Sequence, residues 1–113
     1  MIKLGIYAIC LSLLAPTSAF ADYFAFDRGN ALYENCISSE SVRVAFCLGS
    51  ASAYLDMMQA LGYSCPGYGR TSNRRQVADV LTKFLKENPE LRHQPAASLA
   101  VQAFTKGFGC KQQ

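Results

Sequence analysis

Five cysteines and a single histidine are the most reactive side chains in this chain of 113 residues. The cysteines are Cys10, Cys36, Cys47, Cys65 and Cys110. Their thiols could form disulfides, bind a metal ion or act as nucleophiles. None stands in a Cys-x-x-Cys or Cys-x-x-Cys-His motif, which would favour metal, redox or haem chemistry. The redox state of the compartment decides whether such cysteines form disulfides, bind a metal ion or stay reactive. The first residues of the chain predict that compartment.

The segment 1–21 has the three parts of a secretory signal peptide. Lys3 supplies the positive charge, residues 4–15 form the apolar stretch, and Ala19-Phe20-Ala21 is a small-x-small cleavage site. The apolar stretch is shorter than the roughly 20 residues of a membrane span, so we expect cleavage and no membrane insertion. The sequence therefore predicts export to the periplasm and a single mature domain, 22–113.

Removal of the signal peptide leaves four cysteines, an even number in a short exported chain. In an oxidising compartment such a set favours disulfides over a metal site or a reactive thiol. We expect the pairs Cys36–Cys47, across a short turn between two helices, and Cys65–Cys110, between a long loop and the last residues. No metal and no cofactor are predicted.

His93 lies in the proline-flanked turn 90–95, where it could act as a general base or shape the turn. With the cysteines paired and no serine elbow, it has no nucleophile to activate, and we favour the structural role. Sugar hydrolysis would need two carboxylates, and the nearest candidates are Glu34, Glu40 and Asp56. A small bundle, however, leaves little room for a sugar cleft. The sequence therefore predicts a protein that binds, not an enzyme.

The candidate binding residues lie in and after the long loop 64–73: they are Tyr68, Arg70, Arg74 and Arg75. Tyrosine and arginine often dominate the binding energy of protein interfaces. Arg74 and Arg75 would fall in the first turn of a helix, where positive charge opposes the helix dipole, so helix stability does not explain them. The alternative is a solvated loop whose arginines only begin that helix. The mature net charge of +2 predicts no nucleic-acid partner.

Helical patterns cover nearly all of the mature chain and predict an all-α fold, a small disulfide-stapled helical bundle of about four main helices. The expected helices are 30–36, 41–63, 74–88 and 89–107, and the last one is interrupted at Pro95. The aromatic residues of the arm 22–27 are expected to cover the bundle.

The helix predicted at 41–63 is apolar on nearly every face, which is typical of the centre of a bundle. Its stripe of Ala45, Gly49 and Ala53 would allow a neighbouring helix or a second copy to approach closely. Gly62 would end the helix.

Three segments together resemble the Tai family of periplasmic immunity proteins. They are Phe46-Cys47-x-Gly49 followed by Asp56; Cys65-Pro66 leading to Gln76-Val77; and Asn88-Pro89-Glu90-x-Arg92-His93 leading through Ala96 and Leu99 to Phe108-Gly109-Cys110. Two positions depart from the family pattern, since Gly109 stands where proline is usual and Ser50 where an aromatic is common. Both departures lie at packing positions.

This resemblance implies a fold related to the HdeA-like periplasmic proteins, with a homodimer as one expected state. It implies a partner as well, a peptidoglycan amidase effector injected by type VI secretion, whose active site the immunity protein binds and blocks. The alternative function is an HdeA-like acid-stress holdase chaperone. We rank it second, because the chain has few carboxylates to protonate and two predicted disulfides that resist opening.

Overall fold

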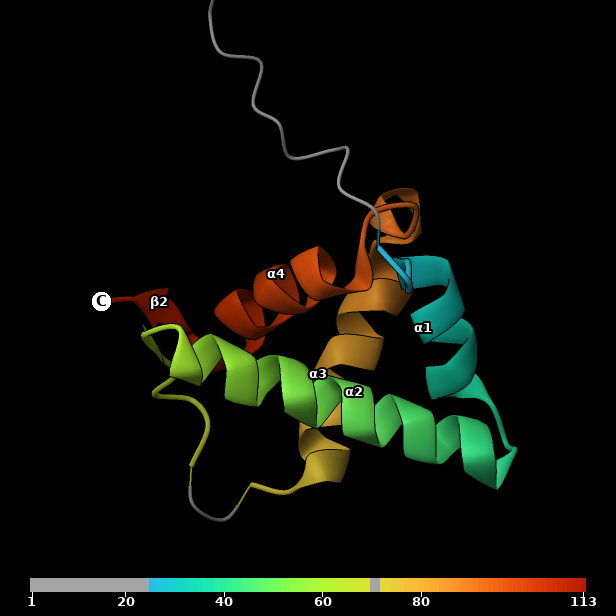
Figure 1. Ribbon diagram of the computed structural model, residues 1–113, viewed down its shortest axis with the longest axis horizontal. Coiled ribbons are helices and arrows are strands. Elements are labelled where there is room, and N and C mark those ends of the chain that lie inside the picture. The colour runs from blue at the N-terminus through green and yellow to red at the C-terminus, as the bar shows by residue number, and fades with distance from the viewer. Residues whose placement is uncertain (1–24, 70–71) are drawn as a thin grey trace, which may run out of the picture.

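Four α-helices make up most of this computed structural model, which describes residues 25–69 and 72–113 (Figure 1). The helices are α1 (Gly29–Ile37), α2 (Ser41–Ala60), α3 (Arg74–Glu87) and α4 (Ala96–Phe108), with a 3-10 turn at Pro89–Leu91 before α4. The predicted all-α fold of about four helices is confirmed. The predicted signal peptide, 1–21, lies outside the described residues.

Two very short strands add a feature that the sequence did not predict. β1 (Tyr63–Ser64) pairs antiparallel with β2 (Lys111–Gln112), so the last residues lie beside the end of α2. Two residues are too few to show the alternation of apolar and polar side chains that identifies a strand.

The core lies where α2, α3 and α4 meet, with α1 closing one side (Figure 1). Every helix contributes at least one fully buried side chain. The largest of these are Leu32, Leu55, Val77, Leu81, Leu85, Leu99 and Phe104. Within the described residues no charged side chain is buried, so burial of apolar surface supplies the main driving force for this fold.

The amphipathic helix predicted after Asn73 is present as α3. The Asn73 side chain accepts a hydrogen bond from the Gln76 amide (3.0 Å), and the Gln76 side chain accepts one from the Asn73 amide (2.9 Å). This reciprocal capping box satisfies two amides that the first helical turn leaves without partners. It also fixes where the preceding loop ends.

The long helix α2 ends at Ala60, three residues before the predicted end, because Gly62 takes a positive φ of 95°. Its Cys47, Ala51, Leu55 and Met58 are buried. The opposite face is exposed, so the prediction that α2 occupies the centre of the bundle is wrong. When apolar residues lie on every side of a helix, the sequence alone does not show that one of its faces is exposed to solvent.

The stripe of Ala45, Gly49 and Ala53 lies on that exposed face. A Cβ atom added to Gly49 would meet no atom within 4 Å. The prediction that a neighbouring helix of the same chain packs on this stripe is therefore wrong. Contact with a second copy stays a prediction.

The last helix begins after Pro95 and ends at Gly109, which adopts the left-handed conformation with a φ of 65°. The sequence pattern pointed to Gly107 as its end. Gly107 instead lies within α4, where a Cβ atom would collide with Val80 Cγ1 of α3. Glycine at this position therefore permits close packing of the two helices.

The described end of the aromatic arm, residues 25–27, does not cover the bundle in the way expected. Phe26, its one aromatic residue within the described part, is 94% exposed. Tyr23 and Phe24 lie outside the described residues. The chain enters the fold just beyond, at a bridge between Arg28 and Pro95.

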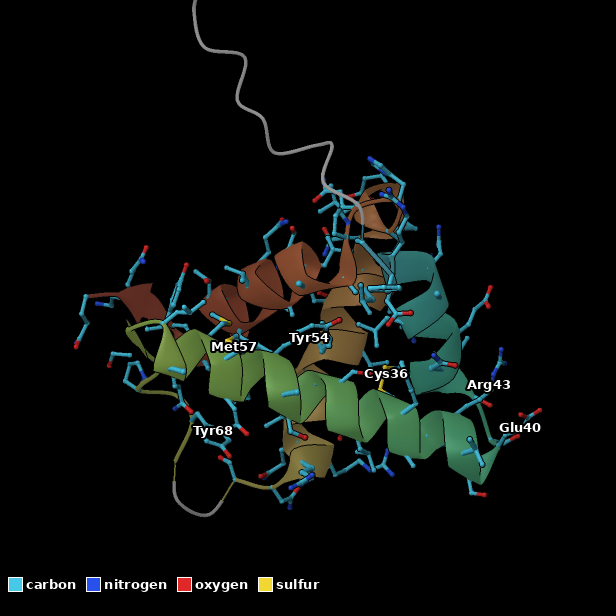
Figure 2. The ribbon with its side chains drawn as sticks, in the orientation of Figure 1. Cys36, Glu40, Arg43, Tyr54, Met57 and Tyr68 are labelled. Atoms are coloured by element: carbon cyan, nitrogen blue, oxygen red, sulfur yellow. A yellow bond between two sulfur atoms is a disulfide. The ribbon has the colours of Figure 1, made fainter. Side chains whose placement is uncertain are left out.

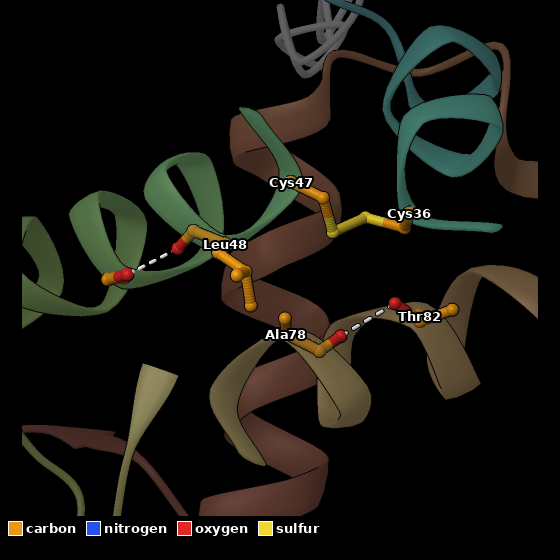
Figure 3. Close-up of a disulfide and its surroundings, with 6 residues drawn as sticks. Cys36, Cys47, Leu48, Ala78 and Thr82 are labelled. Atoms are coloured by element: carbon orange, nitrogen blue, oxygen red, sulfur yellow. Dashed lines mark hydrogen bonds between the residues drawn. A yellow bond between two sulfur atoms is a disulfide. The ribbon is translucent and has the colours of Figure 1, made fainter. Parts of the chain in front are cut away.

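Two disulfides hold the helices together, Cys36–Cys47 and Cys65–Cys110, the same pairs that the sequence predicts. Figure 3 shows the first, which joins the end of α1 to α2 close to Ala78 of α3. The second joins the start of the long loop to the residue after Gly109, and both of its cysteines are buried. Each bridge therefore ties segments that the helical hydrogen bonds alone would leave independent.

Candidate partner-binding site

The long loop between β1 and α3, residues 65–73, is anchored on the end of α4. Its first residue is held by the Cys65–Cys110 disulfide. Two residues later the Gly67 amide donates a hydrogen bond to the Phe108 carbonyl over 2.8 Å. The Tyr68 amide then donates to the Cys65 carbonyl over 3.0 Å, which closes a turn. The first half of the loop is therefore held by both covalent and hydrogen-bond contacts.

Gly67 is required for this anchoring. A Cβ atom at this position would lie 2.8 Å from both the Cα and the carbonyl oxygen of Phe108. Backbone atoms cannot give way as a flexible side chain can, so only glycine lets the loop lie this close to α4.

Tyr68 has a structural role as well as an outward position. Its ring meets the Phe108 ring edge-on, with centroids 5.7 Å apart and planes at 69°, and Phe108 in turn stacks on Phe104. Edge-to-face geometry is a favourable arrangement for aromatic rings. Tyr68 is half-buried, and Figure 2 shows it beside the loop. The tyrosine predicted to bind a partner therefore also extends the core to the loop.

The second half of the loop forms a tight turn. The Gly69 amide donates to the Ser72 hydroxyl (3.2 Å), and the Ser72 amide donates to the Gly69 carbonyl (3.0 Å). Arg70, another predicted binding residue, lies outside the described residues. Its role stays a prediction.

Arg74 and Arg75 are the first two residues of α3, between the two residues of the capping box, and both are exposed. Neither guanidinium has an ion pair or hydrogen bond with the part of the chain that the structure describes. The donors of both guanidinium groups are therefore available to another molecule. A guanidinium binds a carboxylate best, because it can donate two parallel hydrogen bonds to it. Tyr68, Arg74 and Arg75 thus lie on one anchored segment.

The turn 90–95, which contains His93, has a different role. His93 Nδ1 lies 3.0 Å from the Glu90 carbonyl, and Arg28 Nη1 donates to the His93 carbonyl over 2.9 Å. The Arg92 guanidinium lies over the Tyr33 ring, 4.1 Å from its centre, a favourable cation–π contact. This turn fastens the start of α1 to the bundle, which is the structural role favoured for His93.

Two open grooves lie on the surface of the described part. One runs beside His93, between Arg28, Tyr63 and the first turns of α4, and the other lies between α3 and α4. None of Glu34, Glu40 and Asp56 lines either groove, and all three are exposed. The described residues also hold no cluster of three metal-binding side chains. Nor does any helix among them have the length and apolar character to span a membrane.

Sequence reasoning missed the contact of Gly67 with Phe108 because the two residues lie far apart along the chain. The signal that could have found it is the disulfide pair. Since Cys65 is bonded to Cys110, residues two positions from each cysteine must lie near each other. A glycine in that place indicates a close approach of two backbones.

These features define a small disulfide-bonded helical protein with an anchored, arginine-flanked loop, an architecture suited to binding another protein. The sequence profile of the Rap1a immunity proteins matches residues 28–110, which is most of the chain. The chain belongs to the Rap1a family of immunity proteins. No curated protein and no solved structure matches it. The family match supports an immunity function, it does not support the chaperone alternative, and the narrower likeness to the Tai proteins stays a prediction.

Proposed function

We propose that this protein is a periplasmic immunity protein that binds a type VI secretion peptidoglycan amidase and blocks its active site. Membership of the Rap1a family supports an immunity role and a secreted effector as partner. The resemblance to the Tai proteins supports the amidase and the type VI system. Two disulfides and the signal-peptide pattern of residues 1–21 support export to an oxidising compartment.

The inhibitor works by binding alone and needs no cofactor. Its partner surface is the loop 65–73 together with Arg74 and Arg75. One observation carries this assignment: the loop is fixed at both ends, by the Phe108 contacts and by the capping box, while the adjacent arginines have no partner among the described residues. A segment that is ordered before it docks loses less conformational entropy on binding.

The residues of this surface have separate tasks. Tyr68 positions the loop through its packing on Phe108 and offers the exposed part of its ring. Arg74 and Arg75 supply charged donors, and we propose the same for Arg70. Their acceptors on the effector would be carboxylates or backbone carbonyls near the cleft.

The test begins with an amidase gene adjacent to the gene for this protein. Its product is directed to the periplasm of a host cell, and growth is followed with and without this chain. Purified proteins are then mixed, and cleavage of cross-linked peptidoglycan is measured. We expect the chain to restore growth and to inhibit cleavage at a one-to-one ratio.

The surface is tested by Arg74→Glu with Arg75→Glu. Negative charge in the first turn of α3 favours the helix dipole, so this change should not unfold the protein. Binding should weaken by about 100-fold or more, as expected for central arginines at an interface. The matched control is Lys83→Glu with Lys86→Glu, which makes the same charge change on exposed residues further along α3.

Two different failures are distinguishable. If the native chain neither binds the amidase nor protects the cell, the proposed function is wrong. If the native chain protects and the arginine variant inhibits equally well, the function stands and the surface lies elsewhere. The turn 90–93 would be the next region to test.

A further inference from the structure

The groove beside His93 has no part in the proposed function. It is lined by residues from before α1, from β1, and from the turn and first half of α4, and we call it the α4 groove. Its volume is about 640 Å³, which is within the range of sites for small ligands. Pro95, Val101 and the ring of Tyr63 supply its apolar part. The other lining residues are polar or charged: Arg28, His93, Gln94, Ser98 and Gln102.

Arg28 gives the α4 groove a positive charge, and no aspartate or glutamate is among the lining residues. The backbone bridge to Pro95 places Arg28 beside the start of α4 (Figure 1). The guanidinium uses Nη1 to donate to the His93 carbonyl over 2.9 Å, and it forms no ion pair with the described part of the chain. Its Nε and Nη2 donors therefore remain. These two donors lie on one edge of the guanidinium and match the two oxygens of a carboxylate.

Two glutamine side chains in the α4 groove are joined to each other. Gln102 Nε2 donates to Gln94 Oε1 over 3.3 Å and to the Ser98 carbonyl over 3.4 Å. These contacts use the two hydrogens of the Gln102 amide and the oxygen of the Gln94 amide. The Gln102 oxygen remains as an acceptor, and the Gln94 nitrogen remains as a donor. A peptide group has one N–H donor and one C=O acceptor, so the linked pair of glutamines can bind it with both.

We propose that the α4 groove binds a short extended peptide that ends in a free carboxylate. Arg28 binds the carboxylate, Gln94 and Gln102 pair with a peptide group, and an apolar side chain of the ligand lies on Val101 and Tyr63. A few polar groups placed around an apolar wall are what fixes the orientation of a ligand in a groove of this size. The same chemistry occurs in free short peptides and at the C-terminus of a protein.

Other classes of ligand fit the α4 groove less well. A small inorganic anion would contact Arg28 and leave the glutamine pair and the apolar wall unused. A cationic ligand would be repelled by Arg28, and no lining carboxylate would offset that repulsion. A purely apolar ligand would bury the polar groups of Gln94 and Gln102 without hydrogen-bond partners, which costs free energy.

The experiment uses the full chain, expressed for export and purified with its disulfides intact. The probe is the tripeptide acetyl-Ala-Leu-Ala with a free carboxylate, titrated by calorimetry and followed in amide NMR spectra. We expect a Kd of about 100 µM, reasonable for a ligand of this size, and shifts of the Val101 and Gln102 signals. The same tripeptide with a C-terminal amide should bind at least about 10-fold more weakly, because it cannot accept two charge-assisted hydrogen bonds from Arg28.

Arg28 variants test for direct contact with the carboxylate. Arg28→Gln should weaken binding of the acid at least about 10-fold, and the acid and the amide should then bind equally well. A purely structural role of Arg28 would instead weaken both peptides alike and preserve the difference between them. Arg28→Lys keeps the charge without the paired donors, so its affinity for the acid should be intermediate.

Gln102→Glu is a second variant, which leaves the contact between Arg28 and the His93 carbonyl in place. It brings a negative charge into the groove and should weaken binding of the acid by about 10-fold, with a smaller effect on the amide. The matched control, Gln59→Glu, makes the same substitution on an exposed residue that lines neither groove, and it should leave the affinity unchanged. Circular dichroism checks that each variant is folded.

A longer peptide with the same C-terminal residues separates the two sources of ligand. Equal or tighter binding of the longer peptide supports the C-terminus of a protein, and binding of the tripeptide alone supports a free short peptide. No binding of either peptide at about 5 mM would overturn the inference, because even weak specific ligands are bound at that concentration. Equal affinity of the native chain for acid and amide would overturn it as well. The inference is independent of the proposed function, since binding is measured without any effector.

Discussion

The backbone of Gly67 lies directly on the backbone of Phe108, and a hydrogen bond of 2.8 Å joins the Gly67 amide to the Phe108 carbonyl. With the disulfide two residues away at each end, this contact holds the proposed binding loop against the core. It couples the stability of the fold to the position of the loop, so its strength can be measured by mutation.

Gly67→Ala is expected to lower the free energy of unfolding by about 1–3 kcal/mol, the usual cost of forcing extra atoms into a packed contact. The added methyl group would lie 2.8 Å from two backbone atoms of Phe108. Chemical denaturation measures the change. Gly69→Ala is the control, because a Cβ atom there meets nothing within 4 Å and the φ angle is not positive. Equal effects of the two changes would contradict the close approach of Gly67.

The capping box gives a second prediction. Asn73→Ala removes the side chain that accepts from the Gln76 amide, and the free energy of unfolding should fall by about 1 kcal/mol. Asn73→Asp keeps the acceptor and adds a negative charge at the helix N-terminus, so it should retain or improve stability. Urea denaturation of the two variants measures both changes in the free energy of unfolding. A loss of stability in Asn73→Asp equal to that in Asn73→Ala would contradict the role given to the acceptor oxygen, which aspartate keeps.

The capping box and the disulfide pairs are among the features that could be predicted from the sequence. Both depend on residue types at short or constrained spacings: Asn73 stands three residues before Gln76, and Cys36 and Cys47 flank a single turn. The helices themselves follow from apolar periodicity, and the predicted ends of α1 and α3 fall within one residue of those observed.

Other features depend on contacts between distant segments, which periodicity does not reveal. The exposed face of α2 could not be predicted, because its apolar residues surround the helix and nothing local distinguishes Phe46 from Leu55. Gly107 was mistaken for a helix end, since only its proximity to Val80 shows that it permits packing. For the proposed binding site, Tyr68 and the arginines were predicted by residue type, whereas the anchoring by Phe108 needed the structure.

The two disulfides should contribute unequally to stability. Loop-closure entropy predicts about 3 kcal/mol for Cys36–Cys47, which closes 11 residues, and about 4 kcal/mol for Cys65–Cys110, which closes 45. Replacing each pair by alanine and measuring urea denaturation gives the two values. The second pair also holds the loop that we propose binds the effector, so its loss should weaken the proposed inhibition more than loss of the first. Mass spectrometry of a non-reduced digest checks the pairing, and a peptide joining Cys47 to Cys65 would contradict it.

The last prediction concerns Gly49, on the exposed face of α2. In dilute solution, Gly49→Leu should leave the free energy of unfolding unchanged or raise it by up to about 1 kcal/mol. The reason is that leucine favours helix more than glycine does, and the space above Gly49 is open within one chain. Thermal and urea denaturation measure this effect.

The same Gly49→Leu change should weaken the predicted contact of the Ala45, Gly49 and Ala53 face with a second copy, because a bulky side chain would hold the two helices apart. Gly49→Ala is the control of intermediate size and should have a smaller effect. A large loss of stability in dilute solution would mean that part of the chain itself packs on Gly49, against the open space found there. Association unaffected by leucine would place the contact between copies on another face, and the apolar surface of α2 would then need a different partner.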